Sequence, residues 1–455
     1  MSRWNLAWLV GIPLVVLLGL TLTYSAPPLR QKDQNYELVK LLVDVLDEVD
    51  QNYVRELDPV ARRRLVEDMI NGGLERLDPY SAFMGDREYK QFERKSKGKF
   101  GGVGIQIGLD RTTGGLVVTS PMVGTPAYEA GVLAGDQIVK IDGKSLDTLR
   151  TSEAIELIQG EPGTPVTLSV IHEGQKKAVD ITVTRAVIEV ETVLGDRRKP
   201  DDPAEWDYVI DKDRRIAYVR VLEFDEPTAD ALKKVLTKLE GEGVRGLVLD
   251  IRGNPGGLLT SAVAVSDLFL TQGRIVSTQG RKTPERVYSA VPGGTLFEPA
   301  AKHPVAVLVD KYSASASEIV SAALQDHGRA VIVGERSFGK GSVQNIYPME
   351  DRATALKLTT QSYRRPSGKN IHRFPDSKET DEWGVSPNPG YEVKLTDEER
   401  FQFLLARRRR DVVHGKPGAA PAEEKKEEKK APPFVDKVLD KALEYVRGEL
   451  DKQQS

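Results

Sequence analysis

The chain has 455 residues, with 65 Lys and Arg against 68 Asp and Glu, and a formal net charge of −3. Its composition, 39% hydrophobic and 29% charged, indicates a soluble, multidomain globular protein and excludes a disordered chain, a collagen-like chain and a multi-span membrane protein. The absence of cysteine excludes disulfides and thiolate nucleophiles. The near-neutral charge gives no support to nucleic-acid binding. The five histidines do not have the spacing of metal ligands, so no metal site is expected.

Residues 1–30 are predicted to be an export signal or a membrane anchor. Arg3 precedes an apolar run over residues 4–24, which is long enough to span a bilayer. A cleavage site after Ala26 would be poor, because Tyr24 would occupy a position that needs a small residue. We therefore favour an uncleaved anchor in the inner membrane, with the rest of the chain in the periplasm or another extracytoplasmic space.

The next segments differ in composition. Residues 34–95 are polar and predicted to be helical. Short β-rich runs separated by glycine turns occupy residues 96–188, and a charged, proline-containing connector follows over 196–207. Strands alternate with helices over residues 208–396, the pattern of an α/β domain.

The C-terminal part is predicted to hold two helices and a linker. The first helix covers residues 397–414, and low-complexity sequence rich in Lys, Glu, Pro and Ala covers 415–433. An amphipathic helix is expected over 434–452. The apolar terminal helices favour a homo-oligomer, a dimer or larger.

A glycine loop, Phe100-Gly-Gly-Val-Gly-Ile-Gln-Ile107, leads into a predicted strand. Glycines leave successive N–H groups free to converge on an anion. The later stretch Gly131-Val-Leu-Ala-Gly-Asp-Gln-Ile-Val-Lys-Ile-Asp-Gly143 completes a resemblance to a PDZ domain. The resemblance implies that a free peptide C-terminus binds at the carboxylate loop, namely Gly102, Val103, Gly104 and Ile105.

Three serines, Ser313, Ser315 and Ser317, lie between a predicted buried strand and a helix. A hydroxyl at a helix N-terminus is well placed for a developing negative charge. Helix capping would explain these serines equally well. The residues themselves therefore leave the choice between capping and catalysis open.

Lys340 lies between two glycines in the loop after the next strand. A lysine becomes a general base only when desolvation lowers its pKa, and a Ser-Lys pair then needs no histidine. Gly334–Lys340 also fits the first seven positions of a phosphate-binding loop. Gly341 replaces the Ser or Thr of that loop and a strand is expected to follow, so nucleotide binding is not predicted.

The stretch Arg252-Gly-Asn-Pro-Gly-Gly257 joins another buried strand to a helix. Its backbone N–H groups could form half of an oxyanion hole. Glycine turns after strands are common, so this stretch alone is weak evidence for an oxyanion hole.

In this order, these motifs resemble the carboxyl-terminal processing, or tail-specific, serine proteases over about residues 35–396. The resemblance also rests on the stretches Leu77-Asp-Pro-Tyr-Ser81, Gly328-Arg-Ala330, Leu356-Lys-Leu-Thr-Thr360 and Arg365-Pro-Ser-Gly-Lys-Asn-Ile371. It implies a mixed α/β fold: a crotonase-like protease core with an inserted PDZ domain and helical terminal regions.

The resemblance also implies the roles of single residues. Ser315 would be the nucleophile, Lys340 the general base and Gln344 the residue that orients the lysine. The N–H of Ala316 and that of Gly256 or Gly257 would form the oxyanion hole.

The expected function is a serine endopeptidase that needs no cofactor and cleaves proteins near free C-termini, in extracytoplasmic processing or quality control. An adaptor could be a further partner. Gln159 stands where many relatives have Arg, which puts in doubt any gating that depends on a positive side chain there. Two other functions are less compatible with the sequence. An inactive PDZ scaffold would require loss of the serine or the lysine, and the PDZ domain and membrane segment oppose a crotonase-type acyl-CoA enzyme.

Overall fold

The computed structural model describes residues 29–110, 113–147, 149–416 and 434–453. The chain divides into two compact units, Met1–Arg76 and Leu77–Ser455. The first unit contains α2 (Leu29–Asn52) and α3 (Pro59–Leu74). Helix α3 begins after Asp58, whose carboxylate accepts a hydrogen bond from Ala61 N, a regular N-cap.

The predicted membrane segment, residues 4–24, lies outside the described residues. Within the described ranges, no helix combines the length and the apolar character needed to cross a bilayer.

The second unit begins with β1 (Ala82–Met84) and α4 (Asp86–Lys97) and continues into a small β domain. Strands β2 (Lys99–Gly102) and β9 (Ala186–Glu189) pair where the chain enters and leaves this domain. Its sheet has the order β3 (Ile105–Leu109), β4 (Leu116–Pro121), β5 (Gln137–Ile141), β7 (Pro165–Ile171) and β8 (Val179–Thr184), with β6 (Lys144–Ser145) on β5. Helices α5 (Pro126–Glu129) and α6 (Thr151–Ile158) accompany the sheet. Strand β3 is an edge strand.

The connector over 196–207 holds the short pair β11 (Arg197–Arg198) and β12 (Trp206–Asp207). A central sheet follows in the order β10 (Val193–Leu194), β14 (Ile216–Val221), β15 (Gly246–Asp250), β18 (Val305–Val309) and β19 (Val331–Gly334), with β13 (Val209–Asp211) on β14. Strands β14, β15, β18 and β19 run parallel and are almost wholly buried. This burial explains why their sequences are continuously apolar rather than alternating.

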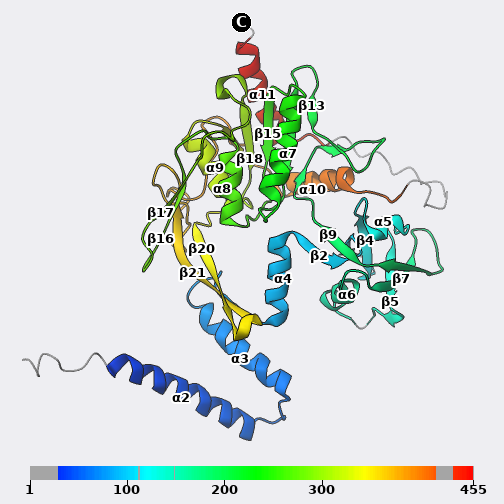
Figure 1. The fold of residues 1–455 in the computed structure, drawn as a ribbon, viewed down its shortest axis with the longest axis vertical. Helices are drawn as coiled ribbons and strands as arrows, with labels where there is room; N and C mark the ends of the chain where they lie inside the picture. The colour runs from blue at the N-terminus through cyan, green and yellow to red at the C-terminus, as the bar shows by residue number, and fades with distance from the viewer. Residues whose placement is uncertain (1–28, 111–112, 148, 417–433, 454–455) are drawn as a thin grey trace, which may run out of the picture. The chain divides into compact units, whose positions relative to one another are not determined.

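Helices cover both faces of the central sheet (Figure 1). One face packs against α7 (Thr228–Gly241), α8 (Leu259–Asp267) and α9 (Ala316–Asp326). The other face packs against α11 (Lys437–Lys452), the last helix of the chain. Successive strand residues therefore point to different partners: Leu247 and Leu249 toward the first helices, and Val248 toward α11.

A second, antiparallel sheet completes this unit. It has the order β1, β21 (Thr354–Arg364), β16 (Arg274–Gly280) and β17 (Arg286–Ser289), with β20 (Ser342–Met349) paired to β21. The remaining elements are α10 (Asp397–Asp411) and two short 3-10 turns, Ala300–Lys302 and Glu350–Arg352. The molecule is thus a mixed α/β protein.

Candidate active site

Three loops leave the carboxyl ends of neighbouring parallel strands. Residues 251–257 follow β15, residues 310–315 follow β18, and residues 335–341 follow β19. Carboxyl ends of parallel strands share one edge of a sheet, which is where ligands bind in open α/β folds. The topology therefore brings together the glycine turn, the serines and the lysine that the sequence singled out.

The surroundings of the three serines differ. Ser313 Oγ is buried and donates to Ile251 O (2.8 Å), and Ser317 Oγ is buried and donates to Asn254 O (2.9 Å). Ser315 is partly exposed, and within the described chain its hydroxyl has no hydrogen-bond partner. Only Ser315 combines an accessible hydroxyl with a position directly before helix α9.

The backbone of Ser315 is strained. Its φ of 56° and ψ of −110° lie in a region that residues with a side chain rarely adopt. Gly256 lies directly against it, because a Cβ added to Gly256 would fall 2.8 Å from Ser315 Cβ and 2.7 Å from Ala314 O. A glycine is therefore required where the 251–257 loop passes the serine.

A buried carboxylate, Glu318, connects the serine and lysine loops. Its Oε2 accepts hydrogen bonds from Ser315 N (2.8 Å) and Lys340 N (2.7 Å). Its Oε1 accepts from Ser337 Oγ (2.6 Å) and Gly339 N (2.7 Å). Burial raises the pKa of Glu318, and these hydrogen bonds oppose the rise because they favour the ionised form. One side chain thus fixes the backbone of both loops.

Tyr363 makes a second connection between the same loops. Its buried hydroxyl lies 3.1 Å from Ser315 O and also contacts Lys340 O. Tyr363 belongs to β21, so the antiparallel sheet supports the edge of the central one. The main-chain positions of Ser315 and Lys340 are therefore restrained from two sides.

The environment of Lys340 disfavours its charged form. Burial lowers the pKa of the Lys340 ammonium, and the nearby positive charge of Lys357 lowers it further, while Glu318 and Asp78 oppose the shift. The ring of Tyr80 lies 4.8 Å from Lys340 Nζ. This is the kind of environment that a neutral, proton-accepting lysine requires.

Close backbone packing around the lysine depends on its flanking glycines. A Cβ on Gly339 would fall 2.7 Å from Arg373 Cβ, and one on Gly341 would fall 2.5 Å from His372 N. Neither position could hold a larger residue without moving the opposite strand or loop.

Gln344 is the residue predicted to orient Lys340. Its Nε2 donates to Ser342 Oγ (3.0 Å) and Thr359 Oγ1 (3.0 Å), and no hydrogen bond joins it to Lys340 in the described chain. Thr359 Oγ1 in turn donates to Asp78 Oδ1 (3.0 Å). Gln344 is thus linked to the Leu77–Ser81 motif, whose Tyr80 covers the lysine.

The candidate oxyanion donors are not equivalent. Gly256 N donates to Asn254 Oδ1 (2.8 Å), so this N–H is already used. Among the described residues, the N–H groups of Gly257 and Ala316 meet no acceptor. A Cβ on Gly256 would lie 3.0 Å from Ala316 N, so the glycine turn adjoins the start of α9. The geometry favours Gly257 with Ala316 as the donor pair.

The predicted carboxylate loop leads into the edge strand β3. Val103 O accepts from Ala127 N (2.9 Å) and Gly104 O accepts from Met122 N (2.9 Å), whereas within the described residues the N–H groups of Val103 and Gly104 meet no acceptor. Gly104 has φ 84° and lies close to Thr125. Gly102, the last residue of β2, pairs with Ala186 of β9, and Ile105 is the first residue of β3. A loop with free donors beside an open strand edge can accept a peptide end.

Sequence reasoning assigned no role to Glu318, Tyr363 or Thr359. A local signal existed for Glu318, since Ser315 and Glu318 have the spacing of a capping box. Tyr363 and Thr359 carry no local signal for these contacts, which form because β21 folds back on β20 directly after the lysine loop.

The chain is similar to proteins of known families. The sequence model of peptidase family S41 matches residues 215–386, and that of the PDZ domain matches residues 117–171. The carboxy-terminal-processing protease of Bartonella bacilliformis is 36% identical over 92% of this chain and 91% of that protein. The carboxy-terminal processing protease CtpA of Bacillus subtilis is 33% identical over 81% of this chain and 75% of that protein.

Solved structures are similar as well. The photosystem II D1 C-terminal processing protease is 29% identical, with a TM-score of 0.41 over 78% of this chain and 92% of that one.

Proposed function

The chain belongs to peptidase family S41 and is a serine-type peptidase; from that membership we propose that Ser315 is its nucleophile and Lys340 its general base. The observation that carries this proposal is the Glu318 carboxylate, which binds the backbone N–H groups of both residues. Ser315 is also the one serine of its motif with an accessible hydroxyl.

In the proposed reaction, neutral Lys340 accepts the hydroxyl proton as Ser315 attacks the substrate carbonyl carbon. The N–H groups of Gly257 and Ala316 stabilise the oxyanion of the tetrahedral intermediate. The protonated lysine then gives its proton to the leaving amine. Water hydrolyses the acyl-enzyme with the same lysine as base.

We propose that the substrates are proteins or peptides with a free C-terminus. The free N–H groups of Val103 and Gly104 and the open edge of β3 support this specificity. The role of Gln344 becomes indirect: it contacts the Asp78 and Tyr80 motif through Thr359 instead of orienting the lysine itself.

We also propose that residues 4–24 anchor the protease in the membrane and that it acts outside the cytoplasm, in protein processing or quality control. The apolar run after Arg3 supports this location. Exposure of a C-terminal tag to added protease in spheroplasts tests it, and a tag protected in intact spheroplasts would contradict it. Homo-oligomerisation and an adaptor stay predictions.

The catalytic proposal is tested with the full-length chain in detergent and a peptide that ends in small apolar residues. We expect Ser315→Ala and Lys340→Ala each to lower kcat by roughly 10³-fold or more. Lys369→Ala is the matched control, because Lys369 is exposed and, among the described residues, its ammonium pairs with Glu382 (2.5 Å) at the surface. An amidated copy of the peptide should be cleaved poorly.

Three results would contradict parts of the proposal. Activity in Lys340→Ala would exclude this lysine as the base. Activity in Ser315→Ala would exclude the nucleophile. Equal cleavage of the free and amidated peptides would exclude recognition of the C-terminal carboxylate while leaving the Ser-Lys pair intact.

A further inference from the structure

The side chain of Arg252 connects the last helix of the chain to the 251–257 loop. We propose that Asp436, the N-cap residue of α11, is a positioning residue for the oxyanion donor in this loop and acts through Arg252. The inference rests on the proposed function, because it assigns a role to Gly257 in peptide hydrolysis.

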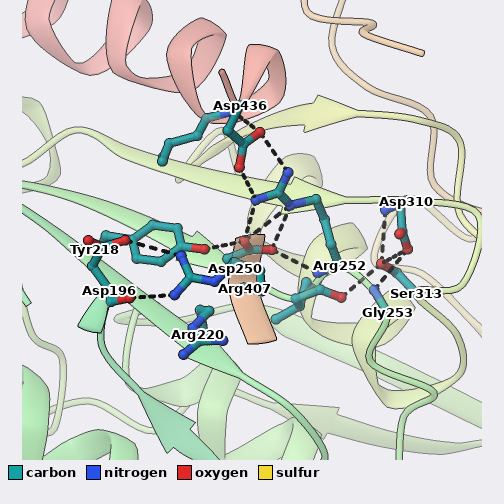
Figure 2. Close-up of polar contacts among 12 residues, drawn as sticks. Asp196, Tyr218, Arg220, Asp250, Arg252, Gly253, Asp310, Ser313, Arg407 and Asp436 are labelled. Atoms are coloured by element: carbon teal, nitrogen blue, oxygen red, sulfur yellow. Dashed lines mark hydrogen bonds and ion pairs between the residues drawn. The ribbon is translucent and has the colours of Figure 1, made fainter. Parts of the chain in front are cut away.

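Arg252 is held between two carboxylates (Figure 2). Asp436 accepts hydrogen bonds from Nη1 (2.9 Å) and Nη2 (2.8 Å). Asp250 accepts from Nε (3.0 Å) and Nη2 (2.6 Å). The side chain of Arg252 is only 2% exposed. A guanidinium buried to this extent depends on both partners, and removing one leaves donors without water or protein acceptors.

The rest of the environment leaves Arg252 little freedom. The ring of Phe403 lies 4.2 Å from its guanidinium carbon. Asp250 is itself held by the Tyr218 hydroxyl, which donates to Oδ2 (2.6 Å). The carboxylates of Asp436 and Asp250 and the ring of Phe403 thus hold the buried guanidinium in one position.

The backbone after Arg252 transmits its position to the site. Gly253 N donates to Asp310 Oδ1 (2.9 Å), as Figure 2 shows. Asn254 Nδ2 donates to Val221 O (2.8 Å), and Asn254 Oδ1 accepts from Gly256 N (2.8 Å). Each residue of the loop up to Gly256, apart from Pro255, is therefore fixed by a hydrogen bond. Displacement of Arg252 would strain the hydrogen bonds of residues 253–256 and shift Gly257, the residue that follows them.

Asp436 is itself placed by the docking of α11. The helix buries Val438, Ala442, Leu443, Val446 and Leu450 against the central sheet. At Gly246 the contact is so close that a Cβ would lie 2.4 Å from Val446 Cγ1. The first turn of α11 is therefore held at a fixed distance from the sheet, and its N-cap carboxylate reaches Arg252 from that position.

Capping and charge can be separated at Asp436. Its Oδ1 also accepts from Leu439 N (3.1 Å), the usual bond of an N-cap. Asparagine caps helices about as well as aspartate, so Asp436→Asn keeps the cap and removes the charge that faces Arg252. Asp451→Asn is the matched control: it lies on the same helix, loses the same charge, and pairs with Arg214 (3.1 Å) while 52% exposed.

The test uses the full-length enzyme and measures kcat, KM and the inhibition constant of a peptidyl boronate, whose tetrahedral adduct occupies the oxyanion hole. For Asp436→Asn we expect kcat to fall roughly tenfold and boronate affinity to fall by a similar factor, with KM unchanged within twofold. Asp451→Asn should match the wild type in all three. A structural role alone would lower the melting temperature without weakening boronate binding relative to KM.

A second variant distinguishes an effect through Arg252 from a general folding defect. If Asp436 acts through Arg252, Arg252→Gln should lower kcat, and Asp436→Asn added to it should lower kcat no further. Fully additive losses would overturn the inference, as would a kcat for Asp436→Asn within twofold of the wild type or equal losses in Asp451→Asn. An inactive wild type would overturn the proposed function and this inference together, whereas an active wild type with an unaffected Asp436→Asn overturns the inference alone.

Discussion

The two faces of the central sheet are built differently. On one face, α7, α8 and α9 each follow directly after a strand of the sheet, so the turns between strand and helix lie at its carboxyl edge. Those turns carry Gly257, Ser315 and Ala316. On the other face, α11 comes from the C-terminal end of the chain and contributes no candidate reacting group.

One face of the sheet therefore supplies the reacting groups, and the other restrains one of the loops that carry them. The face covered by α7, α8 and α9, here called the local face, leaves groups available at the site. The Ser315 hydroxyl and the N–H groups of Gly257 and Ala316 have no hydrogen-bond partner within the described chain. The Asp436–Arg252 ion pair joins α11 directly to the 251–257 loop. We therefore expect substitutions on the two faces to separate catalysis from stability.

The largest effect is expected at Glu318, on the local face. Glu318→Gln would place an amide NH₂ where the carboxylate now accepts hydrogen bonds from N–H and O–H donors. We predict a fall in kcat of roughly 10²-fold or more, because Ser315 and Lys340 lose their common anchor. The free energy of unfolding should fall by about 2 kcal/mol. Peptide hydrolysis and denaturant unfolding measure the two changes.

The control for this prediction is Asp211→Asn. Asp211 is also a buried carboxylate, but it binds Arg447 Nε (2.7 Å) and Arg214 N (3.0 Å) and lies outside the three catalytic loops. It should lose stability while retaining kcat per folded molecule. Equal losses of kcat in both variants would mean that Glu318 acts only on stability.

The opposite pattern is expected on the α11 face. Leu450 is fully buried near the end of α11, and Leu450→Ala should lower the free energy of unfolding by about 3 kcal/mol through lost burial and a residual cavity. Since Leu450 is far along the helix from Asp436, kcat per folded molecule should equal that of the wild type. Activity normalised to active-site titration checks this. A tenfold lower kcat would show that the two faces are not separable.

The smallest effect concerns pH. The positive charge of Lys357 lowers the pKa of Lys340, so Lys357→Gln should raise it. A lysine acts as a base only when neutral, and the acidic limb of the kcat/KM profile should therefore move to higher pH with an unchanged alkaline plateau. Lys369→Gln, on an exposed residue, should leave the profile in place. A shift toward acid in Lys357→Gln would contradict the proposed ionisation of Lys340.

Much of this arrangement was predictable because the informative residues lie in continuous motifs. The glycine loops and the alternation of strands and helices identified the PDZ domain, the mixed α/β fold and the protease family. The candidate residues Ser315 and Lys340 come from the same motifs. Parallel topology then brings their loops to one edge of the sheet, although they are separated in the sequence.

What could not be predicted depends on contacts between distant segments. Glu318 could be recognised as a helix cap, but not as the acceptor for the Lys340 loop. Gly256 and Gly257 look alike in the sequence, and only the Asn254 side chain distinguishes their N–H groups. The contact of Asp436 with Arg252 joins positions 184 residues apart in the sequence, so no local pattern predicts it.

The most direct measurement is the rate at which a fluorophosphonate labels the full-length enzyme between pH 5 and 10, with the modified residue located by mass spectrometry. We predict a single adduct on Ser315. The labelling rate should rise with pH through one ionisation that lies below the ordinary pKa of lysine, and Lys340→Ala should remove this dependence together with most of the rate. An adduct on another serine, or an unchanged profile in Lys340→Ala, would contradict the Ser315–Lys340 pair.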